Sequence, residues 1–253
     1  MKEYINTIIS SFSKFPEIRY IHVIPSDGSI EAAAVASENT ILIRATGPKI
    51  AAVEHPMCLG NLKYLAKVVA TDQIKGDQGT TELVVGQSLD QTSIVRHIHF
   101  IGPRIRIPYE TTDPKAGNVS SVPSIKNQVW SAKLTIEPTV VREFRDAVGL
   151  QSLVNADKTD FKVVQRGEDA FFVFETGSGS DKDIELSVGK FEGEMAESPM
   201  YLNASRFGAA ISLGSESEGA TLTLSKSAAK IEFHRAGLEY EIIMPKSIAP
   251  GAR

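Results

Sequence analysis

The sequence predicts an α+β protein in which a few helices lie on one face of mostly antiparallel β-sheet. Three observations support this class: strand-like runs outnumber helical ones, each half repeats the same order of elements, and a segment rich in proline and small polar residues separates the halves. A parallel α/β fold would need a helix between successive strands, and the chain has too few helical segments. We therefore expect two similar domains: residues 1–125, including a connector at about 108–125, and residues 126–253.

In the first half, a helix is expected over residues 1–14, because Ile5, Ile8, Ile9 and Phe12 recur at spacings of three and four and Pro16 follows. A second helix is expected over 57–71, with Leu62 and Leu65 on its apolar face. The remaining apolar runs, bounded by turn residues, predict strands at 19–24, 30–35, 40–45, 81–85, 94–101 and 104–107.

In the second half, Pro138 is placed to open a helix over 138–148, and Gly149 is placed to end it. A weaker helical pattern covers 201–213. Strands are expected at 129–136, 161–165, 170–175, 184–188, 220–225, 230–234 and 238–244, with Trp130, Phe171, Phe172 and Phe174 as core residues.

Composition excludes several classes of protein. Lys plus Arg number 27 and Asp plus Glu 31, which gives a net charge of −4 and argues against a protein that coats nucleic acid with its whole surface. Cys58 is the one cysteine, so no intrachain disulfide and no cysteine-based zinc site is expected. No signal peptide or membrane span is apparent, which predicts a cytoplasmic protein without membrane contact.

The distribution of charge is uneven along the chain. The four helical windows carry a net charge of +4 and the rest of the chain −8. Lys and Arg are good helix formers that commonly just solvate a helix face. The alternative is a protein with one basic surface that meets a phosphate backbone.

Two passages of the second half resemble DNA polymerase sliding clamps, with the T4-like bacteriophage type as the best match and proliferating cell nuclear antigen as its relative. SAKLTIEPTVVREFRDAVGLQ is similar to the first strand and helix of the clamp's second domain. The passage from SPMYLNASRFGAA to LEYEIIMPK is similar to its closing helix and meander. The first half matches mainly in element order, around PMCLGNLKYLAKVVA. The long connector and the proline-containing tail depart from the phage pattern.

This resemblance implies a non-enzymatic ring, in which three two-domain chains enclose duplex DNA without reading its sequence. Such a ring tethers a DNA polymerase, is opened by a clamp loader and needs no cofactor. The implied DNA-facing residues are Lys2, Lys14, Lys63, Lys67, Arg142, Arg145 and Arg206. The implied partner-docking residues are Val122, Pro123, Ile242, Ile243, Met244 and Pro245. For the isoleucines, ordinary burial in the core is the competing interpretation.

Other functions have less support in the residues. A β-rich viral structural or assembly protein would share the strands but would have no reason to place basic residues on helices. His97 and His99 lie on one face of a strand, yet no further zinc ligand is spaced to join them. No P-loop, G-x-S-x-G motif or calcium loop occurs, and the segment Gly177–Ser180 predicts a hairpin turn, so a hydrolase is disfavoured.

Overall fold

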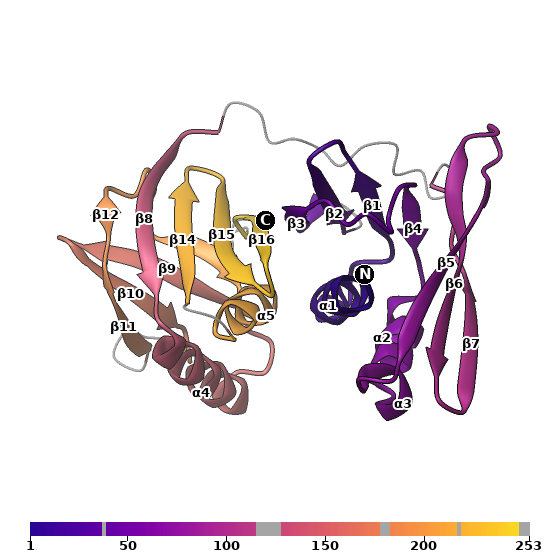
Figure 1. The fold of residues 1–253 in the computed structure, drawn as a ribbon. Helices are drawn as coiled ribbons and strands as arrows, with labels where there is room; N and C mark the ends of the chain where they lie inside the picture. The colour runs from indigo at the N-terminus through magenta and orange to yellow at the C-terminus, as the bar shows by residue number, and fades with distance from the viewer. Residues whose placement is uncertain (37–38, 115–127, 178–182, 217–218, 248–253) are drawn as a thin grey trace. The chain divides into compact units, whose positions relative to one another are not determined.

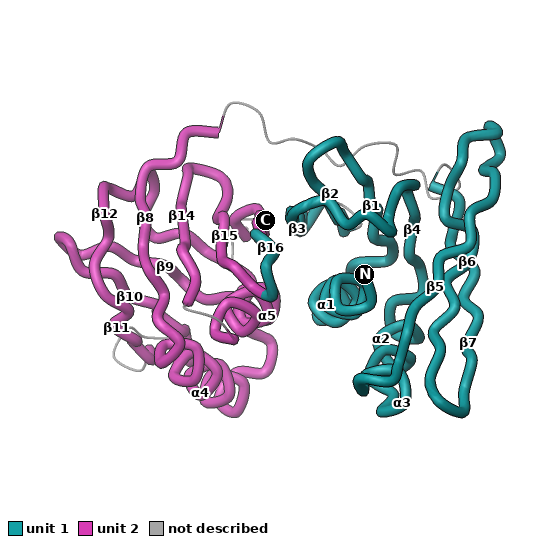
Figure 2. The backbone as a smooth tube through the Cα atoms, in the orientation of Figure 1, with its two compact units in different colours: residues 1–124, 236–239 teal, residues 125–235, 240–253 magenta. Residues whose placement is uncertain are grey.

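The structure, a computed structural model, describes residues 1–36, 39–114, 128–177, 183–216 and 219–247. The chain divides into two compact units, shown in different colours in Figure 2. Unit 1 comprises residues 1–124 and 236–239, and unit 2 comprises residues 125–235 and 240–253. The predicted domain boundary at 125/126 lies outside the described residues and stays a prediction.

The described residues of unit 1 form three helices and contribute strands to two antiparallel sheets (Figure 1). Its elements are α1 (Lys2–Phe12), β1 (Ile21–Pro25), β2 (Ser29–Val35), β3 (Leu42–Pro48), β4 (Met57–Leu59), α2 (Leu62–Ala70), α3 (Asp72–Lys75), β5 (Thr80–Gln87), β6 (Ser93–Gly102) and β7 (Ile105–Glu110). Within the unit, the order of neighbouring strands is β3-β2-β1-β4 in one sheet and β5-β6-β7 in the other. The apolar stripe predicted for the first helix is buried, with Ile8, Ile9 and Phe12 all at 0% exposure, and α1 packs against α2.

Unit 2 has the same construction. Its elements are β8 (Trp130–Ile136), α4 (Pro138–Val154), β9 (Asp160–Arg166), β10 (Asp169–Phe174), β11 (Ile184–Lys190), β12 (Glu192–Gly193), β13 (Met200–Asn203), α5 (Ala204–Gly214), β14 (Ala220–Ser225), β15 (Ala228–Arg235) and β16 (Leu238–Pro245). The strand orders are β11-β10-β9-β13 and β12-β8-β14-β15-β16. The helices α4 and α5 contact each other, as α1 and α2 do in unit 1.

The core of unit 2 is a cluster of phenylalanines that joins both helices to the sheet. Phe144 of α4 lies with its ring centroid 5.0 Å from that of Phe161, 5.1 Å from that of Phe207 and 5.3 Å from that of Phe174. Phe172 completes the cluster at 5.8 Å from Phe144. Most of the pairs meet edge to face, which is the geometry that aromatic rings prefer.

The prediction of core aromatics is confirmed for Phe172 and Phe174, which are fully buried. It is wrong for Phe171 and Trp130, which are only half-buried. Each of these rings instead supports a cation: the Arg166 guanidinium lies 4.9 Å from the Phe171 centroid, and the Lys230 ammonium 5.2 Å from that of Trp130.

Several predicted boundaries are wrong. The helix expected over 57–71 is a strand, β4, followed by α2, because Asn61 takes a left-handed conformation (φ 46°) that separates the two. The helix expected to end at Gly149 continues to Val154. Residues 201–203 belong to β13 and only then does α5 begin. The connector expected from residue 108 begins later, because residues 108–110 lie in β7; from residue 115 it lies outside the described residues.

The two units share one topology, apart from elements described in one unit only: β8 and β12 in unit 2, and the short helix α3 in unit 1. In each, a helix precedes a four-stranded sheet, and a second helix leads into a three-stranded meander, β5-β6-β7 or β14-β15-β16. In unit 2 the strand β8 precedes α4 and pairs antiparallel with β14. In unit 1, α1 begins at Lys2, and β5 is an edge strand among the described residues.

Candidate nucleic-acid interface

The helix α2 presents two lysines to solvent. Its buried face is formed by Leu62, Leu65, Val68 and Val69, so the opposite face is directed outward. Lys63 and Lys67 are exposed on that face, one helical turn apart. Tyr64, 42% exposed, lies between them. The structure therefore brings these two predicted cations together on one surface.

The helix α4 exposes two arginines together with two acidic residues. Arg142 and Arg145 are exposed, as are the acidic Glu143 and Asp146. The Arg145 guanidinium donates a hydrogen bond to Ser212 Oγ at 2.7 Å, which links α4 to α5 and fixes the arginine's orientation. The outer face of α4 thus carries guanidinium donors suited to phosphate, with no net positive charge in this stretch.

The other predicted cations are dispersed. Lys2 is the first residue of α1 and Lys14 lies two residues beyond its end at Phe12, so the full length of the helix, about 16 Å, separates them. The Lys2 ammonium donates to the carbonyls of Gly76 at 2.6 Å and Gly79 at 3.0 Å, so it holds α1 to the start of β5. Arg206 is half-buried in the first turn of α5, where its N–H donates to Asn203 Oδ1 at 3.1 Å.

The residues predicted to dock a partner are mostly internal. Ile242, Ile243 and Met244 are 0%, 6% and 2% exposed, so their side chains contribute to the protein's own core. Pro245 is exposed at the end of β16. Val122 and Pro123 lie outside the described residues.

An exposed apolar patch on α4 was not predicted from the sequence. Leu150, Leu153 and Val154 are 54%, 83% and 67% exposed. Their i, i+3, i+4 spacing is a helical signal, but the glycine at 149 predicts a helix end just before them. The buried Gln151 anchors this end of α4, since its Nε2 donates to the carbonyls of Asp160 and Glu175, both at 3.2 Å.

Cys58 Sγ lies 4.0 Å from His22 Nε2 in the core, where burial lowers the pKa of the histidine. His99 Nδ1 lies 2.7 Å from Arg106 and 3.8 Å from the Glu82 carboxylate, and the described residues contain no group of three or more His, Cys, Asp or Glu that could hold a metal ion. Burial, with a smaller contribution from the charge of Asp113, raises the pKa of Cys58 to about 12, so its thiol stays protonated. No helix among the described residues is long and apolar enough to cross a membrane.

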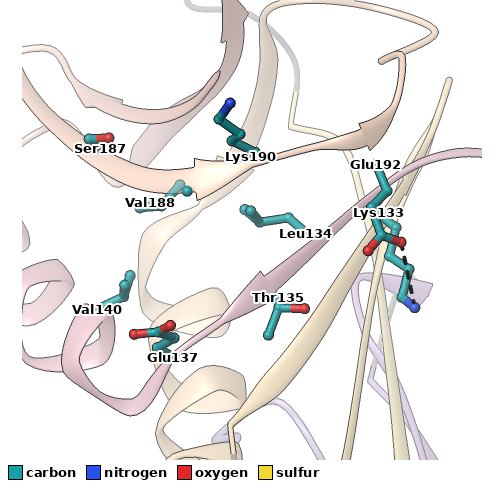
Figure 3. A pocket seen from close by; sticks show the side chains of 10 residues that line it. Lys133, Leu134, Thr135, Glu137, Val140, Ser187, Val188, Lys190 and Glu192 are labelled. Carbon is teal, nitrogen blue, oxygen red and sulfur yellow. Dashed lines mark ion pairs between the residues drawn. The ribbon is translucent and has the colours of Figure 1, made fainter. Parts of the chain in front are cut away.

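A pocket of about 390 Å³ lies in unit 2 beside β8, β11 and the start of α4 (Figure 3). It is lined by Lys133, Leu134, Thr135, Glu137, Val140, Ser187, Val188, Gly189, Lys190 and Glu192. Lys133 Nζ and Glu192 Oε2 form an ion pair of 3.9 Å at its rim. The lining has hydroxyl groups but no histidine or cysteine, so the pocket does not combine a nucleophile with a histidine base.

No family model and no curated protein matches the sequence. Solved structures match over nearly the whole chain. Proliferating cell nuclear antigen (PCNA) of Thermococcus kodakaraensis has a TM-score of 0.64 and 14% identity, covering 98% of this chain and 97% of that one. A. fulgidus PCNA, bound to the C-terminal region of FEN-1, has a TM-score of 0.67 and 13% identity, covering 98% and 96%. A PCNA2–PCNA3 complex of Sulfolobus tokodaii has a TM-score of 0.67 and 13% identity, covering 96% of each chain. The protein therefore has the α+β DNA-clamp fold of the PCNA-type sliding clamps.

Proposed function

We propose that this protein is a sliding clamp: a ring of three chains that encircles duplex DNA and holds a DNA polymerase on it, without catalytic activity of its own. The observation that carries the proposal is the lysine pair on α2. Lys63 and Lys67 are exposed on a helix whose other face is packed into a clamp-fold unit. The arginines lie on α4, the first helix of unit 2, which corresponds to α1 rather than to α2 of unit 1.

The chemistry of these side chains suits sliding. Ammonium and guanidinium groups bind phosphate oxygens, which are identical at every base pair, so the contacts carry no sequence information. Each contact is weak and is exchanged with counterions as the duplex moves. Lys14 and Arg206 would add further cations, and so would Lys2, whose ammonium also donates to two backbone carbonyls.

Two features support assembly into a trimer. The edge strands β7 and β11 each have a neighbour on one side only among the described residues, and open edges favour pairing with a second chain. The apolar patch on α4, residues Leu150, Leu153 and Val154, is the kind of surface that a subunit contact covers. Two clamp units per chain would close a ring of six with three chains.

The proposed partners are the polymerase, a clamp loader and duplex DNA, in the cytoplasm of a host cell if the protein is of the phage type. The solved complex of A. fulgidus PCNA with the C-terminal region of FEN-1 supports docking of partner tails on this fold. For this chain we propose the end of β16, where Pro245 is exposed, together with Val122 and Pro123 of the connector; the buried Ile242, Ile243 and Met244 would support that surface from below.

The proposal is tested by topology rather than by affinity alone. A ring threads onto linear DNA through a free end and is trapped when both ends are then blocked with bulky protein, whereas a surface-bound protein dissociates regardless of the ends. We expect a species with three times the mass of the 27.4 kDa chain and retention only on end-blocked DNA. A monomer by sedimentation, or equal retention with open ends, would refute the proposal.

Charge reversal tests whether the basic residues of α2 and α4 face the DNA in the proposed ring. The variant K63E/K67E/R142E/R145E should lose retention and show a weaker salt dependence, with the log–log slope smaller by about 0.9 for each phosphate that is no longer bound. The matched control reverses four exposed basic residues outside the helices: Lys49, Arg104, Lys133 and Lys226. An equal loss in both variants would indicate a general charge effect and would remove the helices from the proposed interface.

A further inference from the structure

The two units carry the exposed cations of their helices at different places. In unit 1, Lys63 and Lys67 lie on the second helix, α2. The helix α5 corresponds to α2, since it leads into the β14-β15-β16 meander as α2 leads into β5-β6-β7. Its one charged residue is the half-buried Arg206. In unit 2 the exposed arginines Arg142 and Arg145 lie instead on the first helix, α4.

One of these arginines reaches from α4 to α5. The two helices pack closely where Phe144 of α4 meets Gly208 of α5, because a Cβ on that glycine would lie 3.3 Å from the phenylalanine ring (Figure 1). One turn farther along α5, Ser212 Oγ accepts a hydrogen bond of 2.7 Å from the Arg145 guanidinium. A guanidinium that belongs to α4 is thereby held on the helix that has no exposed cation of its own.

The Ser212 hydroxyl is arranged to accept a hydrogen bond. It donates its one proton to the carbonyl of Gly208 on the preceding turn, which leaves its lone pairs for the guanidinium. The residue is 8% exposed, so water has little access to this acceptor. Ser212 also lies in the last turn of α5, where the partial negative charge of a helix C-terminus attracts a cation. These features hold the guanidinium of Arg145 in one place.

The contact orients Arg145 without neutralising it. Two other arginines of unit 2 are held by carboxylates, Arg166 by Glu185 and Arg235 by Glu216. A serine is uncharged, so the full positive charge of Arg145 remains. The guanidinium has further N–H donors in a planar fork that matches phosphate, and the structure pairs none of them within its described part.

We propose that Ser212 is a positioning residue for the DNA contact of the clamp. It holds Arg145 over the α4–α5 contact, so that one guanidinium meets a phosphate on behalf of both helices of unit 2. Because the arginine is ordered before DNA arrives, less side-chain freedom is lost on binding. The proposal rests on the proposed clamp function and adds a residue that never touches the DNA itself.

A first experiment separates orientation from charge. Binding of the full chain to a labelled linear duplex is measured by fluorescence anisotropy over a series of salt concentrations. Ser212→Ala should weaken binding about threefold or more, the scale of ordering one long side chain. The log–log salt slope should stay the same, because the charge remains. Arg145→Met should weaken binding and lower the slope by about 0.9, since one phosphate contact is lost.

The double variant and two controls complete this experiment. In the Arg145→Met background, Ser212→Ala should have no further effect, because the serine acts through the arginine. Ser212→Thr keeps the hydroxyl and should bind as the wild type does, and Ser205→Ala removes an exposed hydroxyl of the same helix without effect. A further loss in the double variant, equal losses in the alanine and threonine variants of Ser212, or an equal loss in Ser205→Ala would overturn the proposal.

A second experiment observes the tether in the DNA-free protein. The Nε resonance of Arg145, assigned by its loss in Arg145→Met, is followed by ¹⁵N relaxation. It should report a rigid side chain in the wild type and a mobile one in Ser212→Ala, whereas Arg142 should be mobile in both. A mobile Arg145 in the wild type would overturn this inference and leave the clamp function standing. A wild type that binds no duplex would refute the clamp function, and with it the phosphate contact, even where relaxation shows the tether.

Discussion

Phe144→Ala should destabilise unit 2 strongly. The Phe144 side chain is 1% exposed, and its ring contacts four other aromatic rings with centroid separations of 5.0–5.8 Å. Removing a buried phenylalanine costs about 3–5 kcal/mol, because transfer energy is lost and a cavity remains. Removal of several edge-to-face pairs, worth about 0.5–1.5 kcal/mol each, places this site near the upper end of that range.

Trp130 is the natural reporter, because it is the one tryptophan of the chain and lies in β8 of unit 2. With a urea m-value of about 2 kcal/mol per molar, a loss of about 4 kcal/mol moves the midpoint of the tryptophan fluorescence transition down by about 2 M. Glu143→Ala is the matched control, since Glu143 is the exposed neighbour on the same helix, and its effect should stay within about 0.5 kcal/mol. A midpoint shift below about 0.5 M for Phe144→Ala would refute the assignment of this cluster as the core.

Three other sites give measurable expectations. Burial alone would raise the pKa of Glu175, but hydrogen bonds from Lys158 and Lys162 outweigh it and hold that pKa below the ordinary value of 4.5. The ionised Glu175 therefore stabilises the fold above pH 4.5, and this contribution is lost as the pH falls through the folded-state pKa. The free energies of unfolding of wild type and Glu175→Gln, measured by urea titration, should differ at pH 7 and converge toward pH 3. Gly219→Ala should cost about 1–3 kcal/mol by the same assay, because Gly219 has φ +114° and no room for a Cβ, whereas Gly177→Ala, with open space around it, should be neutral. Leu153→Asp should dissociate the proposed trimer in sedimentation experiments without shifting the tryptophan unfolding midpoint; an unchanged mass would remove the α4 patch from the subunit contact.

Periodicity predicted the fold class and most elements, and failed where local signals conflicted. The stripe of α1 was unambiguous because its apolar residues keep a helical spacing through Phe12. Residues 57–59 are buried on both faces of β4, so they lack the alternation of apolar and polar residues that marks a strand. Their apolar run therefore merged with the apolar pattern of α2, and one helix was predicted over both. Gly149 costs the helix about 1 kcal/mol, but α4 continues past it because the buried Gln151 anchors the last turns through two hydrogen bonds.

The sequence predicted the candidate site only for residues whose exposure follows from the apolar pattern of a single helix. Exposure of Lys63, Lys67 and Arg142 follows from the apolar residues on the opposite faces. The engagement of Lys2 could not be predicted, because its two acceptors lie more than 70 residues away in the sequence.

The anchoring of Gln151 has a consequence for how the apolar end of α4 meets another surface. A helix terminus normally frays, and freezing it on contact would cost conformational entropy for each residue ordered. Two hydrogen bonds from one buried amide to the carbonyls of Asp160 and Glu175 fix the last turn before any contact is made. Leu153 and Val154 are therefore presented on a preorganised scaffold, and in the proposed subunit contact little of the affinity gained by burying them would be lost to ordering the helix.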